Sequence, residues 1–367
     1  MASQQMESQL GHADSSAAAC GLAPSAEYAE QGAAATALLG ALGRMNALEL
    51  RPSGIGEAGG TADAAAAHSR LEARARELLS RLPSRVQLSA EDEARAMAAP
   101  LTAAFAAEVK HLNATLAAIG GSLHDLLQHL AAGAPSGLTP SKEQQELIAS
   151  LTANATPTAW TERAHMDLPR AFQLATPRPL ASWMGRIHAA HTQLSAFSNR
   201  LEVPLVTDMS ALFSPIAFLT AVKQSLGRAA GGVLRSLDEL TLTVEVTSAT
   251  TADALSAPTA RGVYVSGLSL SGARWDGAAA GGAGGLTDCG RELESPMPVT
   301  LLCCSTGVPN KEGAAEGGGT LYKCPVYHTS ARGVSALDID AWLASEAPPG
   351  KWLLAGVAIF LEKVAGL

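Results

Sequence analysis

The stretch Val263–Gly277, VYVSGLSLSGARWDG, indicates the fold class of the second half of the chain. Apolar residues alternate with small or polar ones as far as Leu270, which is typical of a half-buried strand. The alternation ends at the tripeptide RWD (residues 274–276), between Gly272 and Gly277. We interpret RWD as a corner after a strand, where the Trp covers the core while the Arg and Asp point outward.

Two more specific interpretations of RWD are not supported by the sequence. A WD propeller repeats a unit of about 40–45 residues, whereas the WD dipeptide occurs once in this chain. An Arg–Asp catalytic pair is not expected either, because neighbouring residues of an extended chain face opposite sides.

Around this stretch the apolar period divides the chain into two parts. Before about residue 235 the period is helical, most clearly from Pro100 to Leu130, and further helices are predicted over Ser69–Leu82 and Arg178–Leu201. Thr139 is predicted to cap a helix that starts at Pro140. From Leu240 the period becomes two, as in LTLTVEV. The order predicts an α+β fold, with an N-terminal helical layer followed by a small antiparallel β-barrel.

The bulk composition excludes several classes of protein. The 26 basic and 34 acidic residues give a net charge of −8 with no basic cluster, so neither nucleic acid nor a membrane surface is an expected partner. Five cysteines without a repeating spacing do not predict a disulfide framework. No apolar run reaches the roughly 18 residues of a membrane span, and the N-terminus lacks the pattern of a secretory signal.

The motifs that usually carry chemistry are weak or absent. GIGEAG (residues 54–59) matches the dinucleotide pattern but follows a predicted helix rather than a strand. There is no Walker A sequence. His188 and His191 would supply two ligands of an incomplete metal site, and His328 and Ser330 lack a nucleophile elbow. We therefore predict no catalytic, cofactor-binding or metal-binding residues.

Six blocks in the second half, taken in order, resemble the C-terminal region of dynein heavy chains. They are LFSPIAFLTAVKQ (212–224), SLDELTLTVEVT (236–247), GVYVSGLSLSGARWDG (262–277), SPMPVTLL (295–302), YKCPVYHTSARG (322–333) and KWLLAGVAIFL (351–361). One block would be a weak signal, whereas six in order are specific. Upstream the likeness is thinner, and LLSRLP (78–83) resembles the exit from the last AAA lid of that family.

The composition of residues 1–66 predicts a low-complexity, disordered segment with one helix. The resemblance implies three further segments and a set of structural residues. Residues 67–99 are expected to be the AAA-lid remnant, 100–235 the helical part and 236–367 the β-barrel part of a dynein C-terminal domain. The residues that carry the family pattern are Phe213, Pro215, Phe218, Gly267, Gly272, Arg274, Trp275, Asp276, Pro325, Tyr327, Arg332, Trp352 and Gly356.

The family likeness also implies a function by contact. The module would dock on the AAA ring of a minus-end-directed microtubule motor, from its own upstream chain or another heavy chain, and modulate motor output without ATPase activity or a cofactor of its own. Intermediate, light-intermediate or light chains are further implied partners, and the cilium and its axoneme the implied location. Some blocks look axonemal and others look like the intraflagellar-transport class. The alternative function is a stand-alone ligand-binding or scaffold β-domain with a helical oligomerisation arm.

Overall fold

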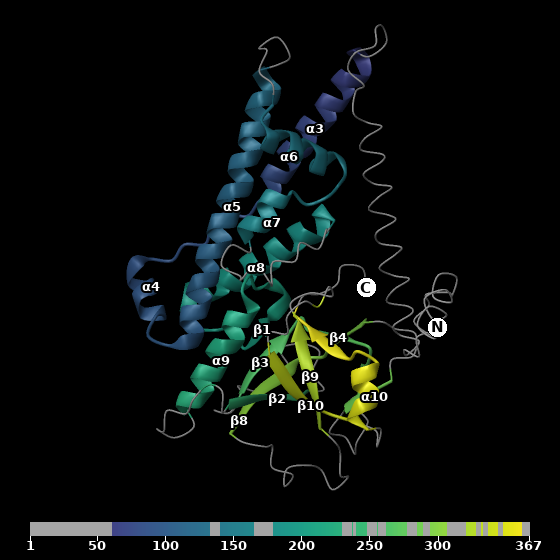
Figure 1. Cartoon of the computed structure of the whole chain (residues 1–367). Helices are drawn as coiled ribbons and strands as arrows, with labels where there is room; N and C mark the ends of the chain where they lie inside the picture. Colours follow the sequence, from purple (N-terminus) through teal and green to yellow (C-terminus); the bar gives the residue numbers. More distant parts are fainter. Residues whose placement is uncertain are drawn as a thin grey trace, which may run out of the picture.

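Most of the helices lie at one end of the molecule, and the strands lie at the other end with helices beside them (Figure 1). The computed structural model describes residues 61–132, 140–164, 179–229, 240–247, 262–276, 285–288, 294–306, 321–327, 337–343 and 348–361, and the single positions 237, 255 and 332. Nearly all of the low-complexity segment predicted over 1–66 lies outside them. The described part of this segment starts at Thr61, where a helix begins.

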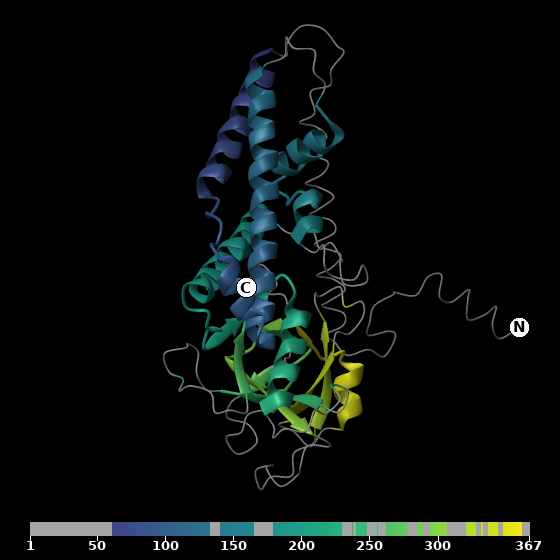
Figure 2. The same ribbon diagram turned by 90° about the vertical axis from the view of Figure 1, so that its left-hand side faces the viewer.

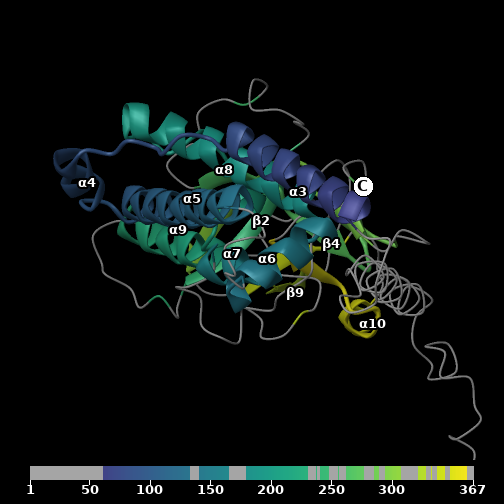
Figure 3. The same ribbon diagram turned by 90° about the horizontal axis from the view of Figure 1, so that it is seen from above.

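The helical predictions are confirmed in kind and largely in their bounds. The described helices are α3 (Thr61–Arg81), α4 (Ala90–Ala96), α5 (Pro100–Ala132), α6 (Lys142–Thr152), α7 (Thr158–Ala164), α8 (Leu180–Arg200), the short η3 (Met209–Ala211), α9 (Pro215–Ala229) and α10 (Pro349–Leu354). The long α5 lies between the others, with α3 along its length (Figure 2). Seen from above, α3 and α8 lie along the same flank of α5 (Figure 3).

Burial explains why α5 is central. Its apolar side chains recur at three- and four-residue steps from Phe105 to Leu130, and those on this stripe are at most 8% exposed. The stripe packs against α3, α7, α8 and α9.

The predicted cap of α6 is wrong. The structure places the N-cap at Ser141, whose hydroxyl accepts a hydrogen bond from the Gln144 amide, while the Gln144 side chain accepts one from the Ser141 amide. This reciprocal capping box satisfies two amides at once. Pro140 therefore precedes the helix instead of starting it.

Eleven described strands form two sheets. They are β1 (Val206–Asp208), β2 (Leu240–Val246), β3 (Gly262–Ser266), β4 (Ser269–Ser271), β5 (Arg274–Asp276), β6 (Gly285–Thr287), β7 (Glu294–Pro296), β8 (Thr300–Thr306), β9 (Leu321–Tyr327), β10 (Leu337–Trp342) and β11 (Ala358–Phe360). Nine of them follow the order β1-β3-β8-β2-β10-β9-β11-β4-β7, and β5 pairs with β6.

The prediction of an antiparallel sheet is wrong in part. The β1–β3, β2–β10 and β9–β11 pairs are parallel, so the larger sheet is mixed. The alternating apolar pattern is the same in both kinds of pairing, so it could not distinguish them. The α+β class is confirmed. A closed barrel stays a prediction, because the described residues show no pairing between the end strands β1 and β7.

RWD itself is a strand rather than a corner. Arg274–Asp276 forms β5, and Trp275 lies opposite Leu286 of β6 in antiparallel register. The chain turns two residues before this strand, at Gly272, where φ is +74°. Glycine adopts this left-handed conformation without the steric cost of a Cβ atom.

One buried core runs through helices and strands alike. Helix α9 packs on β2 and β8, and β1 comes from the helical half of the chain yet pairs with β3. No helix among the described residues combines the length and the apolar character needed to cross a bilayer.

Candidate functional site

The first candidate site is the junction where α5, α8 and the start of α9 meet. Glu108 of α5 is 3% exposed. Its two carboxylate oxygens accept hydrogen bonds from the amides of Phe213, at 2.6 Å, and Ser214, at 2.7 Å. These amides precede the first turn of α9, where an anion is favoured by the helix dipole. One side chain of α5 thus fixes the entry to α9.

Burial governs the acidity of this carboxyl group. Desolvation raises the pKa of Glu108 from its ordinary 4.5 to about 7, although the two backbone hydrogen bonds and the charge of Arg186 act in the opposite direction. The carboxyl is therefore close to half-protonated near neutral pH. The entry to α9 contains a group whose charge changes in the physiological range.

Phe213 is enclosed by polar and aromatic neighbours of two helices. Arg186 of α8 donates a hydrogen bond to the Leu212 carbonyl oxygen at 2.6 Å and lies 5.8 Å from the Phe213 ring centroid. His111 of α5 stacks on the same ring at 5.9 Å. Of the predicted residues here, Pro215 is buried at the first position of α9, and Phe218 meets Phe105 of α5 edge-on at 5.9 Å.

The second feature is the seam between α8 and the sheet. The side-chain amide of Gln193 accepts a hydrogen bond from the Asp208 amide at 2.7 Å and donates one to the Asp208 carbonyl at 3.4 Å. A side chain of α8 therefore occupies backbone groups of the edge strand β1, which would otherwise invite a further strand. Gly267 lies against the Asp208 carboxylate, and a Cβ atom there would overlap Asp208 Oδ1.

The third feature is a cluster around Arg332. Its guanidinium lies 5.9 Å from the Tyr327 ring centroid and 5.7 Å from that of Phe360, the geometry of a cation–π contact. It also donates to Ser271 Oγ at 3.5 Å. Three of the six blocks meet here, because Ser271 belongs to the GLSLSGARWDG block, Tyr327 to CPVYHTSAR and Phe360 to the final block.

Two glycines allow that close approach. A Cβ atom at Gly356 would lie 3.1 Å from Arg332 Nη1, and one at Gly272 would lie 2.8 Å from the Ala355 carbonyl oxygen. Both glycines have positive φ, of 65° and 74°. A larger residue at either position would combine backbone strain with a steric overlap.

The remaining predicted residues belong to β5, β9 and α10. Arg274 is exposed, Asp276 is half-buried, and the half-buried Trp275 packs against the core. Pro325 is half-buried in β9. Trp352 is buried in α10, where its ring lies 5.5 Å from Lys351 Nζ.

Sequence reasoning brought out the aromatic and glycine residues but missed Glu108 and Gln193. Glu108 lies on the strongest apolar stripe of the chain, next to Val109, where a carboxylate needs a partner if it is buried. A carboxylate at a buried position of this stripe was therefore the sequence signal that could have identified Glu108. His328 and Ser330, which the sequence did not favour as a catalytic pair, lie outside the described residues.

The described residues thus define an α+β module in which the singled-out side chains make packing and positioning contacts. The family profile for the C-terminal domain of dynein heavy chains matches residues 34–361. This protein therefore belongs to that family of domains, and the resemblance of the six blocks is confirmed.

Individual relatives agree with this assignment. The sequence is 35% identical over 258 residues to the beta chain of the flagellar outer-arm dynein of Chlamydomonas reinhardtii, covering 70% of this chain and 5% of the relative. It is 30% identical over 290 residues to dynein axonemal heavy chain 11 of Sus scrofa, covering 78% and 6%. The ciliary dynein beta chain of Tripneustes gratilla is 30% identical over 240 residues, covering 64% and 5%. The matched region is thus a small part of each relative.

Proposed function

We propose that this protein acts as the C-terminal module of a ciliary dynein heavy chain, docking on the AAA ring of a minus-end-directed microtubule motor and modulating its output. The observation that carries the proposal is the family match over residues 34–361. The relatives are axonemal, ciliary and flagellar outer-arm chains, which favours the axonemal class over the intraflagellar-transport class and the axoneme as the location.

The module would act by contact rather than by chemistry. A partner that binds one conformation of the ring better than another shifts the populations of the two. The Glu108 junction holds α5 to the entry of α9, which packs on β2 and β8, and Gln193 holds α8 to β1. These links support a module that moves as a unit. In this proposal ATP hydrolysis belongs to other parts of the motor, and intermediate, light-intermediate or light chains are further partners.

Exposed leucines on α10 supply a contact surface for this docking. Leu353 and Leu354 are adjacent and are 69% and 71% exposed. Large apolar side chains this exposed are the kind that a partner surface covers. We place the ring contact here, near the Arg332 cluster, which lies against Gly356 just after α10.

The proposal keeps the division into a helical part over 100–235 and a β part over 236–367, with the strands closing into a small barrel. Support for closure comes from the bridge between Leu286 of β6 and Leu343, the residue after β10. Strand β5 contacts β4 and β7 at one edge of the sheet, whereas β10 lies in the middle of it. The β5–β6 pair would therefore join the β4–β7 edge back to β10 and close part of the sheet.

Docking is tested with a dynein motor domain that lacks its own C-terminal module. The purified protein should bind this ring in a pull-down or by fluorescence anisotropy. The double variant Leu353→Glu/Leu354→Glu should weaken binding, whereas Met97→Glu, at another exposed apolar residue, should not. No binding by the wild-type protein, or robust ATP hydrolysis by the purified protein alone, would refute the proposal.

A further inference from the structure

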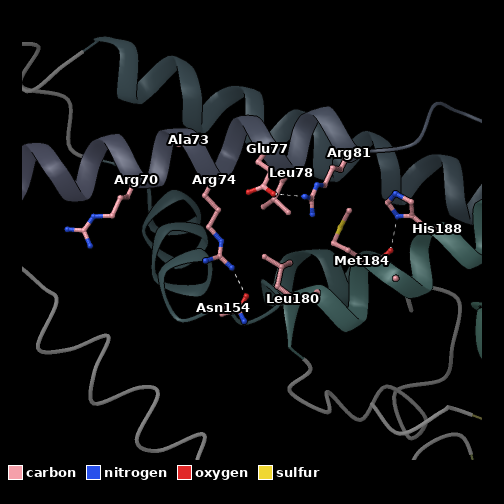
Figure 4. A pocket seen from close by; sticks show the side chains of 12 residues that line it. Arg70, Ala73, Arg74, Glu77, Leu78, Arg81, Asn154, Leu180, Met184 and His188 are labelled. Carbon is pink, nitrogen blue, oxygen red and sulfur yellow. Dashed lines mark hydrogen bonds and ion pairs between the residues drawn. The ribbon is translucent and has the colours of Figure 1, made fainter. Parts of the chain in front are cut away.

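A groove of about 740 Å³ runs between α3 and α8. Figure 4 shows Arg70, Arg74 and Arg81 coming from α3 and Leu180, Met184 and His188 coming from α8. The proposed ring contact on α10 involves none of these residues. The groove is therefore a separate surface.

The charge of the groove opposes that of the whole protein. Residues three, four and seven apart lie on one face of a helix, so Arg70, Arg74, Glu77 and Arg81 line one side. Glu77 pairs with Arg81 at 2.8 Å. The other two arginines form no ion pair with a carboxylate of the described residues. Arg74 donates to the neutral amide oxygen of Asn154 at 2.5 Å, and Arg70 donates to the Ala66 carbonyl oxygen at 3.2 Å.

This arrangement leaves two guanidinium charges on a protein whose net charge is −8. A guanidinium that meets only neutral oxygens keeps its full charge and can still bind a carboxylate. The groove is therefore a local basic site on an acidic molecule, and it would attract an acidic partner.

The floor of the groove is apolar. It is lined by the half-buried Leu78 of α3 and by Leu180 and Met184 of α8, which are buried. The exposed Gly185 of α8 is on the rim, and a Cβ atom added there would meet no heavy atom within 4 Å. A bare backbone with open space above it lets another helix approach closely. An apolar floor beside basic residues fits an amphipathic helix better than a small anion.

We propose that this groove binds an acidic amphipathic helix of a partner protein. At about 1.5 Å per residue, Arg70 to Arg81 spans roughly 16 Å, or three helical turns. The matching helix carries carboxylates three or four residues apart, facing Arg70 and Arg74, and apolar side chains that lie against Leu78 and Gly185. The inference goes beyond the proposed function and does not depend on docking to the ring.

Binding is tested on the full-length protein with a synthetic helical peptide of about 15 residues, carrying Glu and Leu on adjacent faces at helical spacing. Fluorescence anisotropy should show saturable binding that weakens as salt is raised. The variant Arg70→Glu/Arg74→Glu should weaken binding about ten-fold or more. Arg85→Glu, an exposed residue outside the groove, is the matched control and should leave binding unchanged.

A second variant tests the contribution of groove shape to peptide binding separately from that of charge. Gly185→Leu fills the open space without changing any charge, and leucine favours a helix more than glycine does. It should therefore raise or preserve the melting temperature of the protein while weakening binding of the peptide. Any charge-reversal variant is compared only after its melting temperature is shown to match that of the wild type.

Three outcomes would overturn the proposal. The first is no binding of the peptide by the wild-type protein. The second is binding that Arg70→Glu/Arg74→Glu and Gly185→Leu leave unchanged. The third is equal binding of unstructured polyglutamate, which would make the groove a nonspecific anion surface. Loss of binding in both variants, with binding retained in Arg85→Glu, supports the proposal.

Discussion

A charged side chain holds a junction in each half of the protein: Glu108 in the helical half and Arg332 in the sheet half. The two differ in burial and in the kind of partner they contact. Glu108 is 3% exposed, and both of its oxygens accept backbone amides. Arg332 is half-buried, lies over two aromatic rings and makes one long hydrogen bond. A buried carboxylate is stabilising only while every partner is present, whereas a partly solvated cation keeps water as a substitute. The two junctions should therefore respond very differently to mutation and to pH.

The largest effect is expected for Glu108→Ala. It leaves the amides of Phe213 and Ser214 without their acceptor inside the protein, so the free energy of unfolding should fall by about 3–5 kcal/mol. Urea unfolding measures the change. The control is Glu93→Ala, which removes an exposed ion pair with Lys110 and should cost less than about 1 kcal/mol. Equal losses in the two variants would contradict the comparison.

The pH dependence tests the same carboxyl group without removing it. Because the pKa of Glu108 is raised to about 7 in the folded state, the folded protein binds a proton that the unfolded protein has already released between about pH 4.5 and pH 7. The free energy of unfolding should therefore fall by about 2–3 kcal/mol as pH rises through this window.

The matched variant for this pH test is Glu108→Gln, which keeps the shape and loses the titration. Arg186 of α8 and His111 of α5 face the same site, and both side chains are kept in the variant. The difference between the wild-type and variant unfolding curves therefore isolates Glu108. Parallel pH profiles for the two proteins would show that the carboxyl does not titrate in this range.

In the sheet half, the strongest effect is expected at a glycine rather than at the charge. Gly272→Ala places a Cβ atom 2.8 Å from the Ala355 carbonyl oxygen, at a φ of +74°. A loss of about 2 kcal/mol follows from strain and overlap. Gly350→Ala on α10 meets no atom within 4 Å and should be neutral or slightly stabilising. Thermal melting shows whether each variant is less or more stable than the wild type. An unchanged melting temperature for Gly272→Ala would contradict the steric constraint proposed at this glycine.

The smallest effect is expected for Arg332→Lys. The charge is kept, but the planar group that lies over Tyr327 and Phe360 is lost. The free energy of unfolding should fall by about 1 kcal/mol. A loss as large as that of Glu108→Ala would mean that the two junctions are equivalent, against the comparison drawn above.

These residues also mark what the sequence could and could not predict. The apolar stripe of α5 could be predicted because burial on one helical face enforces its spacing. The Arg332 cluster could be predicted only in part. Its sequence blocks were identified through the family, but their contact in space depends on the pairing of β9, β11 and β4, which local patterns do not encode. Parallel pairing escaped prediction for the same reason. Glu108 and Gln193 escaped it because their partners are backbone groups 105 and 15 residues away.

The central claim, that this module tunes a dynein motor by contact, is tested most directly by motility. A ciliary dynein motor domain lacking its own C-terminal module is compared with the same motor in which this protein is fused at that position, by microtubule gliding velocity and microtubule-stimulated ATPase rate. The account predicts that fusion changes both rates and that Leu353→Glu/Leu354→Glu returns them toward the values without the module. Identical rates with and without the module would contradict it.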